Sequence, residues 1–281
     1  MTDAVTSEPT RASVVPWKGL IVGAAAGLLS GLFGIGGGIV IVPALLTLLS
    51  MDRRLAHGTS LAATVPVAAA SLVTYAAGDH VDWTVALFLA IGAIAGAVVG
   101  TQLLQIIPKR PLTIIFVVVI VLTAVRLLIP SDAVGRDPQT TATALLLIAI
   151  GFITGTLAGL LGIGGGVVLV PAMVVLFSMP PVLAKGTSVA VILPSSIVGT
   201  LRNRSNRNVD LRVGIAVGAS GVIFAVIGGL IARSLSATFS NATFAVLLVI
   251  VAAIQIRTLW QPDATPSPSP NPSEDRANEV H

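Results

Sequence analysis

The sequence predicts an all-α polytopic membrane protein built from two homologous repeats, and three observations lead to this fold class. Only 10% of the 281 residues are charged and 54% are hydrophobic, whereas roughly a quarter of the residues of an average soluble domain are charged. Long continuous apolar runs stand where a membrane β-barrel would need alternating segments of about ten residues. The third observation is a gapless internal repeat.

The apolar runs divide the chain into segments that we expect to be helices. They lie at about residues 18–50, 57–77, 83–106, 111–129, 142–178, 185–201, 210–233 and 241–259. Most of them are close to the roughly 20 residues that span a hydrocarbon core about 30 Å thick. The first and the fifth are too long for one crossing, and each contains a cluster of glycines. We therefore expect a helix break at each cluster.

The remaining stretches are expected to lie outside the membrane. Residues 1–17 are polar and lack the basic and apolar regions of a cleaved signal peptide. Residues 131–146 are expected to form a connecting loop. Residues 261–281 contain five prolines between Pro262 and Pro272 and few apolar residues, which predicts a disordered tail. Residues 18–130 and 147–260 are then the two transmembrane repeats.

The repeat becomes visible when the chain is shifted by 128 residues. Leu20–Pro66 and Ile148–Pro194 then agree at 24 of 47 positions, including glycines, prolines, threonines and serines. Chance matching of apolar residues would not hold one register through such residue types. The same shift places Asp82 on Asp210. The chain is therefore interpreted as a duplication.

The basic residues predict how the two copies are oriented, because they mark cytoplasmic loops. In the first copy they follow the first and third segments, at Arg53, Arg54, Lys109 and Arg110. In the second copy they cluster after the second segment, at Arg202, Arg204, Arg207 and Arg212, and the neighbouring loops hold only Lys185 and Arg233. We therefore expect inverted repeats with both termini in the cytoplasm. Each broken segment must then either return to its own side or cross twice.

The glycine clusters are the first candidate binding site. Each cluster has the pattern G-x-G-G-G followed by a proline, from Gly34 to Pro43 and from Gly162 to Pro171. Broken helices at membrane depth can direct helix N-termini toward an anion, which makes Gly36, Gly37, Gly38, Gly164, Gly165 and Gly166 candidate substrate-binding residues. Close helix packing is the alternative. A nucleotide phosphate loop is excluded, because Ile39 and Val167 occupy positions where it needs glycine.

A Gly-Thr-Ser motif in each copy is the second candidate. We expect it to open the next helix, so that Thr59, Ser60, Thr187 and Ser188 either cap that helix or donate hydrogen bonds to the substrate. The preceding position holds His57 in one copy and Lys185 in the other. Lys185 is a candidate charge on the substrate path and His57 a candidate for proton coupling, although both could simply lie at a wet helix end. Asp82 and Asp210 are predicted N-caps, and Gly92, Gly96 and Gly100 a helix-packing stripe.

The residue types of the body favour an anionic substrate. No glutamate occurs between Glu8 and Glu274, whereas carriers of cations or protons usually need buried carboxylates. The candidate site instead offers hydrogen-bond donors. The chain has no cysteine and only three histidines, so no metal site, cofactor or nucleophilic catalysis is predicted. Scattered basic residues at helix ends do not form a nucleic-acid face.

At these residues the chain resembles the sulfite exporter TauE/SafE family, also called the toluene sulfonate uptake permease family. The resemblance rests on the doubled glycine motif, the two Gly-Thr-Ser motifs and Val81-Asp82-Trp83, and it covers residues 18 to 260. It implies an integral inner-membrane transporter, whose relatives move sulfite, sulfoacetate and related organosulfonates as secondary carriers. It also implies that the glycines and the Thr-Ser pairs line the substrate site. The difference between His57 and Lys185 puts an equal contribution of the two halves in doubt.

The leading hypothesis is a secondary transporter of small sulfur-containing oxoanions in the cell membrane, working by alternating access between the repeats. Its expected partners are a small anionic substrate and the lipid bilayer. A passive anion channel of the same fold and a scaffold subunit without transport remain alternatives. The sequence indicates no particular oligomeric state.

Overall fold

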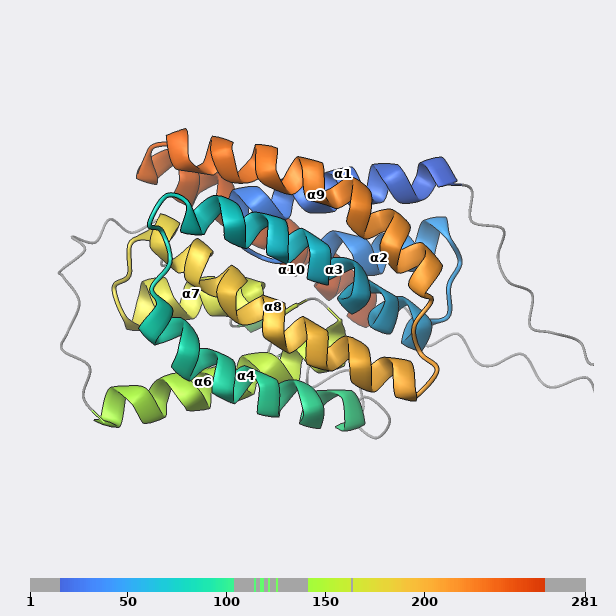
Figure 1. The fold of residues 1–281 in the computed structure, drawn as a ribbon, viewed down its shortest axis with the longest axis horizontal. Coiled ribbons are helices and arrows are strands. Elements are labelled where there is room, and N and C mark those ends of the chain that lie inside the picture. The colour runs from blue at the N-terminus through green and yellow to red at the C-terminus, as the bar shows by residue number, and fades with distance from the viewer. Residues whose placement is uncertain are drawn as a thin grey trace, which may run out of the picture.

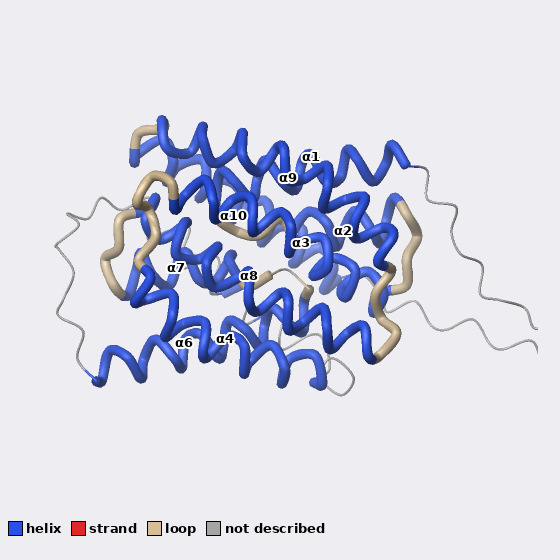
Figure 2. Tube along the Cα trace, viewed as in Figure 1, coloured by secondary structure: helices blue, strands red, loops and turns tan. Residues whose placement is uncertain are grey.

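The computed structural model describes residues 16–103, 141–162 and 164–260, together with positions 114, 117, 118, 121 and 125. All regular structure in these residues is helical (Figure 2). The expected polar tails lie outside the described residues, except for residues 16 and 17, which begin the first helix. Most of the expected helix at 111–129 and of the connecting loop also lies outside them.

The helices lie along one axis of the molecule (Figure 1). They are α1 (Pro16–Phe33), α2 (Gly38–Leu48), α3 (Arg53–Ala76), α4 (Trp83–Leu103), α6 (Thr141–Leu161), α7 (Gly166–Leu176), α8 (Pro181–Ser205), α9 (Leu211–Ser234) and α10 (Ala237–Trp260). The two long segments are broken at their glycine clusters, as predicted. Helix α6 begins within the stretch 131–146 that was expected to be a loop.

The helices of the two copies interleave. The most extensive helix pairs are α4 with α6 and α1 with α9, followed by α3 with α9, α4 with α8 and α3 with α8. Each of these pairs joins a helix of the first copy to a helix of the second. Neither copy is therefore a separate globular unit.

Glycines bring α4 and α6 close together. A Cβ added at Gly92, Gly96 or Gly100 would overlap backbone carbonyl oxygens of Ile148, Phe152 and Thr156 on α6. This confirms that the glycine stripe of α4 is a helix-packing surface. The α1–α9 pair has the same construction, because a Cβ at Gly23, Gly27 or Gly31 would overlap carbonyl oxygens of Val217, Gly221 and Ala225.

Equivalent helices of the two copies run in opposite directions. In Figure 1, α1 and α3 begin at the right-hand end, whereas α6 and α8 begin at the left-hand end. After the break, α2 turns back toward the end from which α1 came, and α7 does the same at the other end (Figure 1). Each of these return helices has 11 residues, which corresponds to about 16 Å of rise, about half the thickness of a hydrocarbon core.

The duplication extends to rare backbone conformations. Four described residues other than glycine have positive φ, and they form two pairs at the spacing of 128. Ser50 and Ser178 have φ of 48° and 47°, and Asp79 and Arg207 have φ of 56° and 57°. The loops after α2 and α7, and those after α3 and α8, thus repeat the same geometry.

The protein is a polytopic membrane protein. Five of the described helices, α3, α4, α6, α8 and α9, are long and apolar enough to cross a membrane. Large apolar side chains cover the outer faces, where Val73 is 68% exposed and Ile215 is 66% exposed. Such an outer surface suits lipid rather than water.

Replacing Gly27 by alanine tests the interleaved packing. The new Cβ would overlap the backbone of Gly221, so α1 and α9 must separate, and we expect the unfolding temperature in detergent to fall by about 5 °C. The matched control is Gly19→Ala on the same helix, where the new Cβ would lie 3.7 Å from Cγ2 of Val217, an ordinary contact distance. Equal unfolding temperatures for the two variants would contradict this packing.

The opposite direction of the copies predicts a labelling pattern. The chain contains no cysteine, so Ala77→Cys in the loop after α3 and Asn206→Cys in the loop after α8 each introduce a single reactive thiol at an exposed position. We expect a membrane-impermeant maleimide to label them from opposite sides of sealed vesicles. Labelling of both from the same side would contradict an inverted arrangement.

Candidate functional site

Both helix breaks are made of glycines in left-handed conformation. In the first break Gly34, Gly36 and Gly37 have φ of 69°, 76° and 76°. In the second, Gly162, Gly164 and Gly165 have φ of 65°, 80° and 74°. Residues with a Cβ adopt such angles only at a steric cost. The glycine motif is therefore what ends α1 and α6 and redirects the chain into α2 and α7.

The two breaks lie against each other in the centre of the molecule. A Cβ added at Gly166 would lie 2.6 Å from Cα of Ile35, in the first break. Thr64 of α3 and Ile192 of α8 flank the meeting point, since a Cβ at Gly164 would lie 3.5 Å from Cγ2 of Thr64 and 3.6 Å from Cγ2 of Ile192. Thr64 and Ile192 are themselves equivalent at the spacing of 128.

Helices α2 and α7 begin at this meeting point without side-chain caps. Gly37 and Gly165 are the N-cap residues, and neither supplies a side-chain oxygen. In α2 the carbonyl of Gly37 accepts hydrogen bonds from the amides of Val40 and Ile41 at 3.0 and 3.2 Å. The amides that precede Val40 belong to the first turn, which has no intrahelical acceptors. The positive ends of two helices thus lie side by side in a buried place.

The prediction that the Gly-Thr-Ser motifs open their helices was wrong. Helix α3 begins at Arg53, with the carboxylate of Asp52 accepting from the amide of Arg54 at 3.0 Å. Helix α8 begins at Pro181, a residue favoured at the first helical position. Stronger start signals four or more residues upstream therefore place the motifs inside the helices, where their amides belong to the helix.

The two threonines of these motifs join the copies. The hydroxyl oxygen of Thr59 accepts a hydrogen bond from the amide of Asp210 at 2.9 Å, and that of Thr187 accepts one from the amide of Asp82 at 2.9 Å. The adjacent glycines permit this approach, because a Cβ at Gly58 or Gly186 would overlap a carbonyl oxygen of the partner loop. Thr59 on α3 thus holds the loop that precedes α9, and Thr187 on α8 holds the loop that precedes α4.

The predicted N-caps are confirmed. The carboxylate of Asp82 accepts from the amides of Thr84 and Val85 at 3.1 Å each. That of Asp210 accepts from the amides of Arg212 and Val213 at 2.9 and 3.2 Å. Both side chains are thus committed to the starts of α4 and α9.

The two serines of the motifs differ. The hydroxyl of Ser60 donates to the carbonyl oxygen of Gly162 at 3.0 Å and so supports the second break. The hydroxyl of Ser188 is buried and has no hydrogen-bond partner among the described residues. A buried hydroxyl without a partner is costly. Ser188 is therefore a donor that a ligand could use.

Lys185 and His57 each lie beside the break of the other copy. A Cβ at Gly34 would lie 2.7 Å from Cα of Lys185, and one at Gly162 would lie 2.8 Å from Cα of His57. Lys185 is 1% exposed, and its Nζ lies 5.4 Å from the ring centroid of Phe33 and 5.9 Å from that of Phe244. A lysine buried at membrane depth is a functional candidate by default.

Several residues at the site were not singled out by the sequence. Thr64 and Ile192 lie one helical turn beyond Ser60 and Ser188, and the spacing of four residues places them on the same helix face. That spacing was the available signal. Phe33 and Phe244 form a stacked pair beside Lys185 with centroids 5.4 Å apart, and Phe244 gave no signal because it comes from α10, far away in sequence.

Comparison with known proteins gives consistent results. The family model described as sulfite exporter TauE/SafE matches residues 3–127 and 147–278. A probable membrane transporter protein of Bacillus subtilis, YunE, is 28% identical over 256 residues, covering 83% of this chain and 92% of its own. A probable membrane transporter protein of Xylella fastidiosa (strain 9a5c) is 28% identical over 250 residues, covering 86% and 94%. No solved structure matches the chain.

Replacing Thr187 tests the link between the copies. Thr187→Val keeps the shape of the side chain but removes the acceptor of the Asp82 amide, so we expect unfolding to become about 1–3 kcal/mol easier. Thr187→Ser keeps the hydroxyl and serves as the matched control. The measurement is the thermal or denaturant unfolding of both variants in the same detergent, and equal stability of the two would contradict the assigned role.

Proposed function

The chain belongs to the sulfite exporter TauE/SafE family of membrane transporters, and from this premise we propose that it is a secondary transporter of small sulfur-containing oxoanions. Sulfite and organosulfonates form this class. The substrate binds where the two glycine breaks meet, and the two copies alternate access to it from the two sides of the cell membrane.

The observation that carries the proposal is the pairing of two uncapped helix N-termini at one buried place. Helix α2 starts at Gly38 and α7 at Gly166, and the two breaks are in contact. Amide groups and positive helix ends at membrane depth suit an anionic group. Sulfite and a sulfonate group each present several acceptor oxygens, which can accept hydrogen bonds from donors of both helices together.

The buried charges have the sign that an anion requires. Among the described residues the buried carboxylate is Asp82, which caps α4, whereas Lys185 is buried beside the first break. A site for a cation would need carboxylate oxygens directed at the breaks. The site thus offers donors and a positive charge.

The two halves contribute unequally to the proposed site. We assign to the substrate site the glycines of both breaks, Gly36–Gly38 and Gly164–Gly166, together with Ser188 and Lys185. We assign to the frame, meaning the contacts that hold the two copies together, Thr59, Thr187 and Ser60. Their hydroxyls have partners in the other copy. His57 occupies the position equivalent to Lys185 and is the candidate for proton coupling.

The basic residues suggest the orientation in the membrane. The first turn of α3 carries Arg53 and Arg54, and the loop after α8 lies at the same end of the molecule, since a Cβ at Gly58 would overlap the carbonyl oxygen of Asn208. By the positive-inside rule, this end faces the cytoplasm. Helix α1 starts at this end as well (Figure 1), which agrees with cytoplasmic termini.

Sulfite flux into proteoliposomes tests the proposal. Gly37→Leu combined with Gly165→Leu is expected to abolish flux, because leucine fills the site and disfavours positive φ. A gentler variant, Ser188→Ala, removes only one donor to a charged ligand and is expected to raise KM about tenfold. Stimulation of uptake by sulfite preloaded inside the vesicles is expected for a carrier, whereas flux without such counterflow would indicate a channel.

Ser195→Ala is the matched control for Ser188→Ala. Ser195 is a buried serine on the same helix whose hydroxyl donates to the carbonyls of Val191 and Ile192 at 3.0 Å each. We expect its KM to equal that of the wild type. An unchanged KM in Ser188→Ala together with intact flux in the double glycine variant would overturn the proposed site, and absence of sulfite or sulfonate flux in the wild type would overturn the substrate class.

A further inference from the structure

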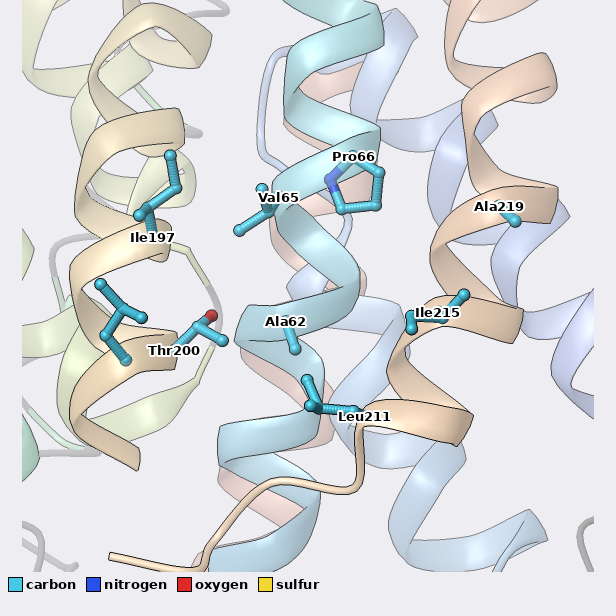
Figure 3. A pocket seen from close by; sticks show the side chains of 9 residues that line it. Ala62, Val65, Pro66, Ile197, Thr200, Leu211, Ile215 and Ala219 are labelled. Carbon is cyan, nitrogen blue, oxygen red and sulfur yellow. The ribbon is translucent and has the colours of Figure 1, made fainter. Parts of the chain in front are cut away.

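An apolar groove lies on the outer face of the protein where α8, α3 and α9 meet (Figure 3). Unlike the breaks, the groove is apolar, because nearly all its lining atoms are carbon. Its volume is about 370 Å³. The floor comes from α3 and the walls from α8 and α9, and the lining includes Ala62, Val65, Pro66, Ile197, Leu201 and Ile215. The one hydroxyl in the lining, that of Thr200, donates to the carbonyl of Ser196 at 2.7 Å.

The duplication supplies an internal comparison for this groove. At the spacing of 128, Ala219 of the groove corresponds to Ile91, Leu211 to Trp83 and Val65 to Leu193. At these three positions the groove residue is smaller than its counterpart, whereas Ile197 and Leu201 of the groove are larger than theirs, Ala69 and Val73.

Four arginines lie at one end of the groove. Leu201 and Leu211 line it, and the chain between them forms the loop from α8 to α9. Within and beside this loop are the exposed residues Arg202, Arg204, Arg207 and Arg212. The nearby carboxylate of Asp210 is engaged by the amides of Arg212 and Val213. The equivalent residues of the first copy are Thr74, Ala76, Asp79 and Thr84, so the corresponding positions of the first copy carry no positive charge.

We propose that the groove and the arginines together bind one anionic phospholipid. An acyl chain lies in the groove, and the phosphate lies among the arginines at the cytoplasmic end. The apolar hollow alone would accept a chain of any lipid, whereas the arginines select for a negative headgroup. Basic clusters at the cytoplasmic ends of membrane helices are a recurrent means of anionic lipid recognition.

Native mass spectrometry of the full chain released from detergent tests this site. The probes are phosphatidylglycerol and phosphatidylcholine with identical acyl chains. We expect one phosphatidylglycerol to be retained with at least about tenfold preference over phosphatidylcholine. Glycerol 3-phosphate, which has the headgroup phosphate without chains, is expected not to displace it. Displacement by glycerol 3-phosphate would reduce the site to a phosphate site and overturn the groove.

Two variants copy residues that the first repeat carries at the same positions. The triple variant Arg202→Thr, Arg204→Ala and Arg212→Thr is expected to lose the preference for phosphatidylglycerol. Ala219→Ile fills the groove without changing charge and is expected to weaken retention of both lipids. Arg233→Gln, at the opposite end of α9, is the matched control and is expected to behave as the wild type.

Each other outcome contradicts the proposal. Equal retention of the two lipids by the wild type would remove the role of the arginines. Unchanged retention in Ala219→Ile would remove the role of the groove. A change in the proportion of dimer in Ala219→Ile, with lipid retention unaltered, would assign this face to contact with a second copy. These readouts do not involve transport, so they are independent of the proposed substrate.

Discussion

One constraint governs this structure: backbone polar groups at membrane depth have no water to bond to. An unsatisfied group there costs several kcal/mol, so irregular backbone must be buried in protein. Both breaks meet this requirement. The amides of Gly34 and Gly162 donate to carbonyls of the preceding helix at 2.8 Å each, and the glycines lie against helices of the other copy. Because each break is buried by the other copy, the helices of the two copies have to interleave.

The interleaving is maintained by contacts that occur twice. Glycines let α1 approach α9 and let α6 approach α4 to backbone contact. Thr59 on α3 holds the loop that precedes α9, and Thr187 on α8 holds the loop that precedes α4. A movement of α3 therefore also moves α9, and a movement of α8 also moves α4. In the proposed alternating-access mechanism, such reciprocal links would couple the movements of the two repeats.

The features that could be predicted from the sequence depend on local residue type and spacing. The breaks follow from clustered glycines, the caps from aspartates that precede apolar runs, and the packing of α4 from glycines at every fourth position. The starts of α3 and α8 were misplaced, because Asp52 and Pro181 lie in stretches of low hydropathy that still form helix. The partners of Thr59 and Thr187 could not be predicted. A repeat reveals which positions are equivalent, but it does not reveal what each position contacts. Those contacts are decided by the interleaving of helices from the two copies, which depends on burial of the breaks.

The departures from the repeat carry the functional argument. Two identical copies related by a two-fold axis would present a site with equal halves. The frame residues come close to that, because the glycine φ values at equivalent positions of the two breaks differ by at most 4°. A substrate without two-fold symmetry would meet the two halves of the proposed site differently, so unequal residues at equivalent positions can contribute to its specificity. Lys185 opposite His57, Ile192 opposite Thr64, and Ser188 without the bond that Ser60 makes are such residues. They lie around the meeting point of the breaks, whereas the equivalent residues that differ in the α8–α9 loop lie at the membrane surface. The duplicated framework thus allows one copy to diverge at the proposed central site and at the proposed lipid site without loss of the contacts that hold both copies together.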